Sequence, residues 1–446
     1  MKIKYIFIAN LAEIARKLVS YITDETEKEA EIKEDFGLCD RFLISDRDER
    51  VLITSWPIDK NFLSDTKKIF DFKNILNLYP AKPSISLCED ILKDQKLKES
   101  LTALIKENNP EVYSYAVTPE FIELIKLLKK EGLKFNAPET PKGGCHLVSF
   151  FGSKAGFRET FSKEKIGEKL GIAMPYGFIA ENGKELLSYA STFYQKRKNF
   201  VIKATSGLAG AGSKIIDIKE TSLTDLEKLI NQFDYWSKGK SVIEEFISPD
   251  LKICGGSPSI EFAVGQSRIN YLYSCGMKIV RGGVFRGIEV GKEVVPLWIE
   301  EKMTAYGFKF AKILAKNGYR GYFDTDFVIS KDKKLYPLEA NVRRTGGTHV
   351  YEAGMKLLGN SFLENYYLAS NNLYENEKLR NFTYQKLKIK LAPLLYPINN
   401  EKRGLILTMV SLLPEGKFGY LVIGKNKDEV LKVERKMDKI FTTLPV

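Results

Sequence analysis

The chain has 446 residues, enough for two or three domains with their own cores, and its apolar (44%) and charged (28%) contents are those of a soluble globular protein. No apolar run approaches the roughly 18 residues of a membrane-spanning helix, so a membrane partner is not expected. The net charge of +12 comes from dispersed lysines rather than a basic stripe with interleaved aromatics, so nucleic acid is not expected as a partner either.

The five cysteines are scattered and form no Cys-x-x-Cys pair. This pattern predicts reduced thiols in a cytoplasmic protein and argues against disulfides and structural zinc. The two histidines, His146 and His349, are too few for a multi-histidine metal site. Neither lies near a serine or cysteine nucleophile motif, so a core or surface role is expected for each.

Residues 1–145 are predicted to form an α/β domain. Residues 3–9 and 51–54 are continuous apolar runs, typical of parallel strands that are covered on both faces. Residues 118–132 predict a helix with a threonine cap, a proline in the first turn and a terminal glycine. The turn-rich segment 138–144 then predicts a domain boundary.

Residues 200–203 predict a strand that ends in Lys203, and a second strand is expected at 214–218. The loop between them is made of small residues and contains Gly207, Gly210 and Gly212. Such a loop can bring backbone N–H groups against phosphate oxygens. It is not a Walker loop, because the lysine precedes the glycines. The alternative interpretation is a flexible hairpin connection.

Further along the chain, two apolar strands carry acidic side chains. The first contains Glu244 and Glu245 and runs into Phe246 and Ile247, and Glu261 lies on the strand that follows. A strand of the first kind can hold adenine through its backbone while a carboxylate accepts from the exocyclic amine. Taken alone, both strands are more often ordinary sheet with solvated acids. Helices are predicted at 163–170 and 301–317.

Asp326, Glu339, Asn341 and Arg343 lie at the ends of two apolar runs joined by a polar turn, so a hairpin would place Asp326 opposite Glu339. Glu339 and Asn341 are two residues apart and therefore share one face of a strand. Oxygen ligands of this kind suit Mg²⁺ and disfavour zinc. Arg343 continues the alternation and can grip a phosphate. An ordinary hairpin with solvated charges is the alternative.

In this order and spacing, the motifs resemble the ATP-grasp superfamily over roughly residues 150–370. The resemblance implies ATP between two α+β lobes, with Glu244 to Ile247 at the adenine and Glu261 near the ribose or the metal. Lys154, which follows Gly152-Ser153, and Lys203 would contact the phosphates. Asp326, Glu339 and Asn341 would hold one or two Mg²⁺ ions, and Arg343 would contact the transferred phosphate.

The domain layout is most similar to the pre-ATP-grasp peptide ligases, the group of the pheganomycin peptide ligase and the butirosin carrier-protein glutamate ligase. It implies an α/β pre-ATP-grasp domain (1–145), a two-lobed ATP-grasp domain (146–377) and a C-terminal α+β segment (378–446). Some peptide ligases of the superfamily carry an arginine where this chain has Asp324. Its replacements could be Arg281, Arg286 or Arg344, although a solvated loop is an equal interpretation for the first two.

The resemblance implies an ATP-dependent carboxylate–amine ligase. A carboxylate would take the γ-phosphate of ATP, and an amine would displace phosphate from the acyl phosphate to form an amide, with the loop 207–212 as a lid. The alternatives are a small-molecule kinase and a non-catalytic ATP-binding module. An amino acid, a peptide or a carrier protein could be the substrate, and the C-terminal segment could cover the site or form a homodimer.

Overall fold

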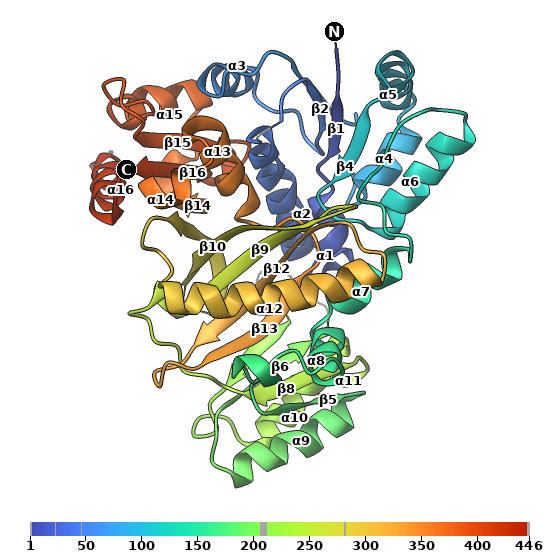
Figure 1. The fold of residues 1–446 in the computed structure, drawn as a ribbon, viewed down its shortest axis with the longest axis vertical. Coiled ribbons are helices and arrows are strands. Elements are labelled where there is room, and N and C mark those ends of the chain that lie inside the picture. Colours follow the sequence, from blue (N-terminus) through green and yellow to red (C-terminus); the bar gives the residue numbers. More distant parts are fainter. Residues whose placement is uncertain (1, 23, 46, 206–211, 281, 444–446) are drawn as a thin grey trace.

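The computed structural model describes residues 2–22, 24–45, 47–205, 212–280 and 282–443. Within these ranges the chain forms three sheets, which stack from the N-terminal part through a large central sheet to a small lobe (Figure 1). Short 3₁₀ helices occur throughout: η1 (Cys39–Leu43), η2 (Glu168–Leu170), η3 (Cys254–Gly256), η4 (Glu377–Leu379), η5 (Ala392–Leu394) and η6 (Leu413–Glu415).

The N-terminal part is an α/β layer around a parallel sheet of order β3-β2-β1-β4. Its strands are β1 (Tyr5–Ile8), β2 (Arg50–Ile53), β3 (Ile75–Leu78) and β4 (Glu111–Ser114). Its helices are α1 (Leu11–Val19), α2 (Glu25–Leu38), α3 (Lys60–Ile69), α4 (Leu87–Lys93), α5 (Gln95–Asn108) and α6 (Pro119–Lys130). The predicted parallel strands and the predicted helix at 118–132 are confirmed, with Thr118 capping α6 through a 3.1 Å bond from the Phe121 N–H.

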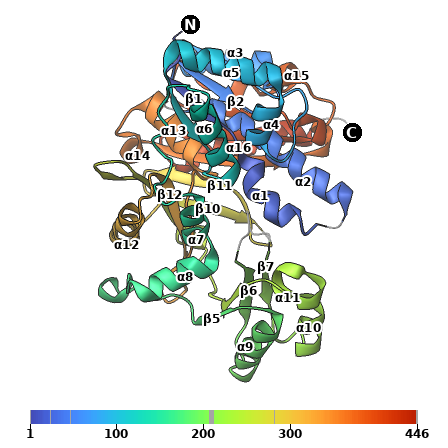
Figure 2. The ribbon, with the colours of Figure 1, turned by 90° about the vertical axis from the view of Figure 1, so that its right-hand side faces the viewer.

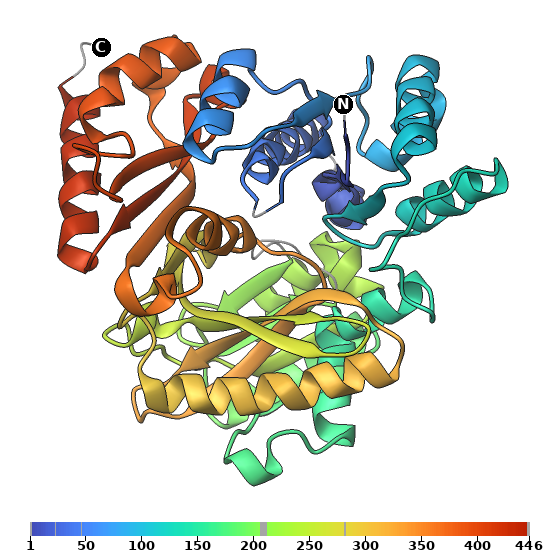
Figure 3. The same ribbon diagram turned by 45° about the horizontal axis from the view of Figure 1, so that its top comes forward.

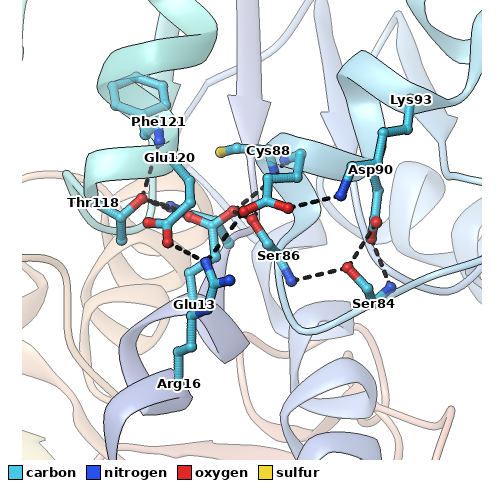
Figure 4. A network of polar contacts seen from close by, with 12 residues as sticks. Glu13, Arg16, Ser84, Ser86, Cys88, Asp90, Lys93, Thr118, Glu120 and Phe121 are labelled. Carbon is cyan, nitrogen blue, oxygen red and sulfur yellow. Dashed lines mark hydrogen bonds and ion pairs between the residues drawn. The ribbon is translucent and has the colours of Figure 1, made fainter.

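A buried carboxylate joins three helices at the carboxyl ends of β1 and β4 (Figure 4). Glu13 of α1 accepts from the hydroxyl of Thr118, from the side-chain amide of Asn10 at 2.8 Å and from the backbone N–H of Cys88 at 2.7 Å. These bonds replace the water that the carboxylate loses on burial, although burial still raises the pKa of Glu13. The network fixes α1 and α4 against α6.

The small lobe is an antiparallel sheet of order β5-β8-β6-β7, packed against helices on one side (Figure 2). Its elements are β5 (Gly177–Ala180), α9 (Gly183–Gln195), β6 (Phe200–Ala204), β7 (Ser213–Ile216), α10 (Leu223–Gln232), α11 (Asp234–Ser237) and β8 (Ser241–Glu245). The ring of Tyr21, after α1, lies 5.4 Å from that of Tyr235 on α11. The N-terminal domain and the small lobe therefore touch directly.

The large sheet has the order β13-β12-β9-β10-β11-β14-β16-β15, and α12 lies across one of its faces (Figure 3). Its strands are β9 (Pro258–Val264), β10 (Ile269–Val280), β11 (Val284–Gly291), β12 (Gly321–Ile329), β13 (Leu335–Asn341), β14 (Tyr367–Glu375), β15 (Gly404–Met409) and β16 (Lys417–Gly424). The helices are α7 (Cys145–Phe151), α8 (Lys154–Lys163), α12 (Leu297–Lys316), α13 (Thr348–Leu358), α14 (Phe362–Asn365), α15 (Tyr384–Leu391) and α16 (Lys427–Thr442).

The described residues of the last segment, 378–443, join this sheet, since β16 pairs with β14 and β15 pairs with β16. The same segment shares a hydrophobic core with the N-terminal domain. Asp40 reinforces that contact by accepting from the backbone N–H groups of Val410 at 2.9 Å and Ser411 at 2.8 Å. The last segment is thus built into the body of the molecule.

The expected combination of α/β and α+β parts is confirmed, but one predicted helix is wrong. The helix placed at 163–170 lies earlier, as α8, and residues 168–170 form only a 3₁₀ turn. Lys165 adopts a left-handed φ of 49°, which ends a right-handed helix. Among the described residues, no helix is both long enough and apolar enough to cross a membrane.

Candidate nucleotide and metal site

The predicted hairpin is present, with the predicted register. β12 and β13 run antiparallel, with Asp326 opposite Glu339 and Asp324 opposite Asn341. On its other edge β12 pairs with β9, where Glu261 stands opposite Asp324. Directly paired residues share a face of the sheet. The three strands therefore carry a row of acids across one face. The hairpin of β12 and β13, with Asp324, Asp326, Glu339 and Asn341, is called the acid hairpin below, and Glu261 on β9 is its neighbour.

Hydrogen bonds order the amide of Asn341 within this row. Its nitrogen donates to Asp324 Oδ1 at 2.9 Å and to Asp326 Oδ2 at 3.1 Å. Its oxygen accepts from Arg343 Nη2 at 2.8 Å. Asn341 would have to turn its amide to offer that oxygen to a metal, because the nitrogen faces the acids here.

Burial and mutual repulsion dominate the electrostatics of the hairpin. Burial raises the pKa of Asp324, and Glu261 adds to the rise. Burial also raises the pKa of Asp326, with Asp324 and Glu339 adding to it. For Glu339 burial acts in the same direction, but the charges of Lys154 and Lys203 outweigh it and lower its pKa. The charge of Arg343 lowers the pKa of both aspartates, but they do not have the additional effect of the two lysines that act on Glu339.

The donor set fits Mg²⁺. Asp326 Oδ1 is buried and has no hydrogen-bond partner among the described residues. Within the same ranges, no group of three or more His, Cys, Asp or Glu side chains converges closely enough to enclose a metal. Mg²⁺ is commonly held by one or two carboxylates together with substrate phosphates and water, so it does not need such an enclosure.

Two lysines reach the acids from elements outside the hairpin. Lys154 opens α8, whose first backbone N–H donates to Thr205 O at 2.9 Å, so the helix start is fixed against the end of β6. Lys154 Nζ lies 2.8 Å from Glu339 Oε2. Lys203 is the fourth residue of β6 and contacts Glu244. The structure thus brings Lys154 into contact with the acid hairpin, and Lys203 lies near enough for its charge to lower the pKa of Glu339.

Arg158 is a site residue that the sequence interpretation missed. It lies on α8 one turn after Lys154, so the two side chains share a helix face. Its Nη1 is 3.1 Å from Glu244 Oε2, while Lys203 holds the other oxygen of that carboxylate. Glu244 is only 2% exposed and is engaged by these two cations. The spacing of Lys154 and Arg158 was the available signal.

The predicted adenine segment follows Glu244. Glu245 donates its backbone N–H to Tyr176 at 2.7 Å, and Phe246 donates to Asn199 at 2.9 Å. Both donors are therefore taken by the protein. Of the predicted segment, Ile247 lies beyond these two bonds.

Glu261 is the centre of a buried network rather than an exposed ligand. It accepts from the hydroxyls of Tyr273, Thr348 (2.6 Å) and Thr345 (3.1 Å) and is 1% exposed. Burial raises the pKa of Glu261 to about 7 although these three bonds lower it. Its partners Thr345 and Thr348 fix the chain between Arg343 and α13.

The structure does not bring Arg286 to the acid hairpin. Arg286 lies on β11, separated from β12 by β9 and β10, and its guanidinium is 3.0 Å from Glu375. Arg344 is held by Glu139 at 2.6 Å and donates to Ser114 O at 2.9 Å. Of the candidate arginines in the described ranges, Arg343 is the one that contacts the hairpin. Gly212 lies next to β7. Three predicted residues fall outside the described ranges: Gly207, Gly210 and Arg281.

No family model matches the chain. A curated relative, the L-propargylglycine–L-glutamate ligase of Streptantibioticus cattleyicolor, is 24% identical over 299 residues. That match covers 63% of this chain and 56% of the relative, or about half of the relative's length.

Three solved structures share the fold across nearly the whole chain. The biotin carboxylase of Campylobacter jejuni has a TM-score of 0.56 at 14% identity, covering 98% of this chain and 91% of its own. The N5-carboxyaminoimidazole ribonucleotide synthetase of Thermus thermophilus has a TM-score of 0.54 at 11% identity, covering 99% of both chains. The biotin carboxylase domain of the Hydrogenobacter thermophilus 2-oxoglutarate carboxylase, solved with MgADP, has a TM-score of 0.53 at 13% identity, covering 99% and 90%.

Proposed function

We propose that this chain, which has the ATP-grasp fold of the carboxylases and synthetases above, is an ATP-dependent carboxylate–amine ligase. The observation that carries the proposal is that Lys154 and Arg343 contact the acid hairpin, while Lys203 lies near enough to lower the pKa of Glu339. These three cations come from three separate elements. Their convergence on one row of carboxylates matches the needs of a triphosphate with its metal.

The chain's own residues bind and orient in this proposal. Lys154 leaves Glu339 and contacts the phosphates. Lys203 leaves Glu244 and also contacts the phosphates, while Arg158 keeps Glu244 in place. Arg343, which in this structure donates to the Asn341 oxygen, stabilises the charge on the transferred phosphate. A substrate carboxylate takes the γ-phosphate, and the amine then displaces phosphate from the acyl carbon. The protein supplies no covalent nucleophile.

Asp326, Glu339 and Asn341 would hold Mg²⁺, with Asp324 adjacent. When bound, the ion neutralises the triphosphate and orients its end. MgADP in one of the structures with this fold and ADP in another support ATP and Mg²⁺ as the ligands here.

Amino acids or short peptides are the proposed substrates. The name of the curated relative states that it joins L-propargylglycine to L-glutamate, which supports this choice. A carrier protein as acceptor stays a prediction from the domain layout. A homodimer has support from the Hydrogenobacter thermophilus carboxylase domain, which was solved as a dimer.

The relatives favour neither alternative, a kinase or a non-catalytic module, because the proteins found are named a ligase, a synthetase and carboxylases. We also propose a cytoplasmic location. All five cysteines are free thiols in the structure, which supports a reducing compartment.

The test is ADP release with Mg²⁺, ATP and pairs of amino acids, with mass spectrometry of the product. We expect an amide product together with free phosphate, whereas a kinase would leave phosphate on the product. Glu339→Ala should reduce turnover by about 100-fold or more, because it removes both a metal ligand and the partner of Lys154. Near-normal turnover in a folded Glu339→Ala enzyme would remove the metal assignment.

A further inference from the structure

An arginine without a partner lies beside the proposed site, in the N-terminal domain. Arg41 of η1 is 5% exposed, and its side chain has no hydrogen-bond or ion-pair partner among the described residues, with Nε fully buried. Its guanidinium carbon lies 5.2 Å from the centre of the Phe42 ring and 5.8 Å from that of Tyr115. A buried guanidinium without an anion is costly, so this position favours an anionic ligand.

An acid lies close to this arginine without touching it. Asp35, in the last turn of α2, has its pKa raised to about 7 by burial and by Glu31, while the charges of Arg41 and Arg343 lower it. The backbone also places Asp35 beside the turn that carries Arg41, since α2 ends at Leu38, η1 begins at Cys39, and Cys39 Sγ donates to Asp35 O at 3.3 Å. In the described part of the chain, neither Arg41 nor Arg343 forms an ion pair with Asp35. Asp35 and Arg41 thus offer opposite charges that do not neutralise each other by direct contact.

Tyr115 connects this pair of charges to the acid hairpin. Arg343 Nη1 lies 3.4 Å from the Tyr115 hydroxyl, and its guanidinium carbon is 5.7 Å from the centre of the ring. The ring of Tyr115 is therefore close to both Arg41 and Arg343. Since Arg343 also contacts Asn341, a ligand held by Asp35 and Arg41 would lie next to the end of the phosphate chain.

A neutral histidine adds to the polar surroundings. His349 of α13 is 2% exposed, and neither of its ring nitrogens has a hydrogen-bond partner within the described ranges. Burial and the charge of Arg41 lower the pKa of His349 to about 3, so the ring is neutral and offers one donor and one acceptor. Arg41 and His349 come from different domains, which places the unsatisfied groups at the junction between them.

We infer that Asp35 and Arg41 bind the amine substrate as a free α-amino acid, with its ammonium on Asp35 and its carboxylate on Arg41. This inference rests on the proposed function, to which it adds a substrate class. A guanidinium fork matches a carboxylate through two parallel hydrogen bonds, and a carboxylate accepts from an ammonium. Only a free amino acid carries both charges on one carbon. The N-terminus of a peptide lacks the adjacent carboxylate, and a carrier-protein arm lacks both groups.

The first experiment uses the full-length protein with Mg²⁺ and a non-hydrolysable ATP analogue. Each common L-amino acid is titrated by calorimetry, and any that binds is compared with its α-amide and its N-acetyl form. We expect one or more free amino acids to bind and both derivatives to bind about tenfold more weakly or worse. Absence of binding by every free amino acid, or equal binding of the α-amide, would overturn the inference.

Variants test whether Arg41 binds the carboxylate of the ligand and Asp35 binds its ammonium. In Arg41→Gln the free amino acid and its α-amide should bind with the same low affinity. In Asp35→Asn the free amino acid and its N-acetyl form should bind with the same low affinity. Arg41→Lys, which keeps the charge but not the fork, should lie between wild type and Arg41→Gln. Arg16→Gln and Glu27→Gln change the same charges at exposed positions of the same domain, so they should bind as wild type does. Unchanged discrimination in a folded Arg41→Gln protein would sink the assignment.

Nucleotide binding is measured separately on the same samples. If the ATP analogue binds but no amino acid does, this inference is contradicted and the ligase proposal is left intact. If an amino acid binds but the ATP analogue does not, the ligase proposal is contradicted and Asp35 and Arg41 remain as a binding site.

Discussion

Most charged side chains inside this protein are compensated by partners from distant parts of the chain. Glu244 is shared by Arg158 and Lys203, and Arg344 pairs with Glu139. Such pairs remove the cost of leaving a buried charge alone, although they add little net stability. His349 has no such ion pair within the part of the chain that the structure describes, and burial instead keeps its ring neutral by lowering its pKa. Its titration therefore appears in the stability of the whole molecule.

We expect His349 to make the protein acid-sensitive. Its pKa is about 3 in the folded chain, because of burial and Arg41, against roughly 6.5 when unfolded. Between these values the unfolded chain binds a proton that the folded chain refuses, so stability falls as the pH drops below the unfolded value. At pH 5 the free energy of unfolding is lower than at neutral pH by about 2 kcal/mol.

Urea unfolding at pH 7 and pH 5 measures this effect. His349→Gln should lose less stability than wild type over that interval, by the amount given above. His146→Gln is the control, because His146 is exposed and should leave the pH dependence as in wild type. Equal pH slopes for wild type and His349→Gln would contradict the assignment.

At the scale of elements, the acid hairpin carries buried acids side by side, which lowers the stability of the fold. An alternation with period two places Asp324 and Asp326 on one face of β12, and their pairing with β9 and β13 brings further acids beside them. A strand packed for stability would carry apolar residues on such a buried face. Under the proposed function, the repulsion among the acids is the cost of a site that attracts a divalent cation.

We expect Asp326→Asn to stabilise the ligand-free protein by about 1 kcal/mol while reducing ATP turnover by about 100-fold or more. Burial and the charges of Asp324 and Glu339 disfavour the ionised form of Asp326 and raise its pKa, and the neutral Asn avoids this cost. Thermal melting without metal and an ADP-release assay measure the two effects. Asp332→Asn, at the exposed turn of the same hairpin, should show no such gain, since Asp332 pairs with Lys334. A lower melting temperature for Asp326→Asn would refute the trade-off.

At the scale of the whole molecule, the N-terminal domain, the central sheet and the last segment form one body. Their residues share a hydrophobic core, and Arg344 adds a polar link from the loop after β13 to the N-terminal domain. It forms two bonds with Glu139, of 2.6 and 2.8 Å, and one with Ser114 O. The position of Asp35 and Arg41 relative to Arg343 depends on this junction.

Arg344→Met should lower the free energy of unfolding by about 3–5 kcal/mol, because it leaves Glu139 buried without its partner. Protease cleavage in the segment 137–144 should become faster as the junction loosens. The double variant Arg344→Met/Glu139→Leu removes both charges and should recover part of the loss, as measured by urea unfolding. A double variant no more stable than Arg344→Met would show that the lost packing of the arginine, rather than the unpaired acid, causes the effect.

The sequence by itself determined the local features. The apolar runs fixed β1 and β2, the cap and proline fixed the start of α6, and the alternation of Asp326, Glu339 and Asn341 fixed the register of the hairpin. These features could be predicted because strand period, capping and turn geometry depend on residues that are close in the chain. The helix predicted at 163–170 failed because one left-handed residue decided its end.

Only the tertiary structure decided which side chains meet. The resemblance put Lys154 and Glu339 in one site without showing that they would touch, and it did not indicate that Arg158 would hold Glu244 or that the last segment would complete the central sheet. The placement of Arg41 beside Tyr115, without an ion-pair partner in the described part of the chain, was equally hidden. These contacts join residues far apart in the chain. They form because buried charges and sheet edges need partners, and several partners would satisfy that need equally well until the whole chain is packed.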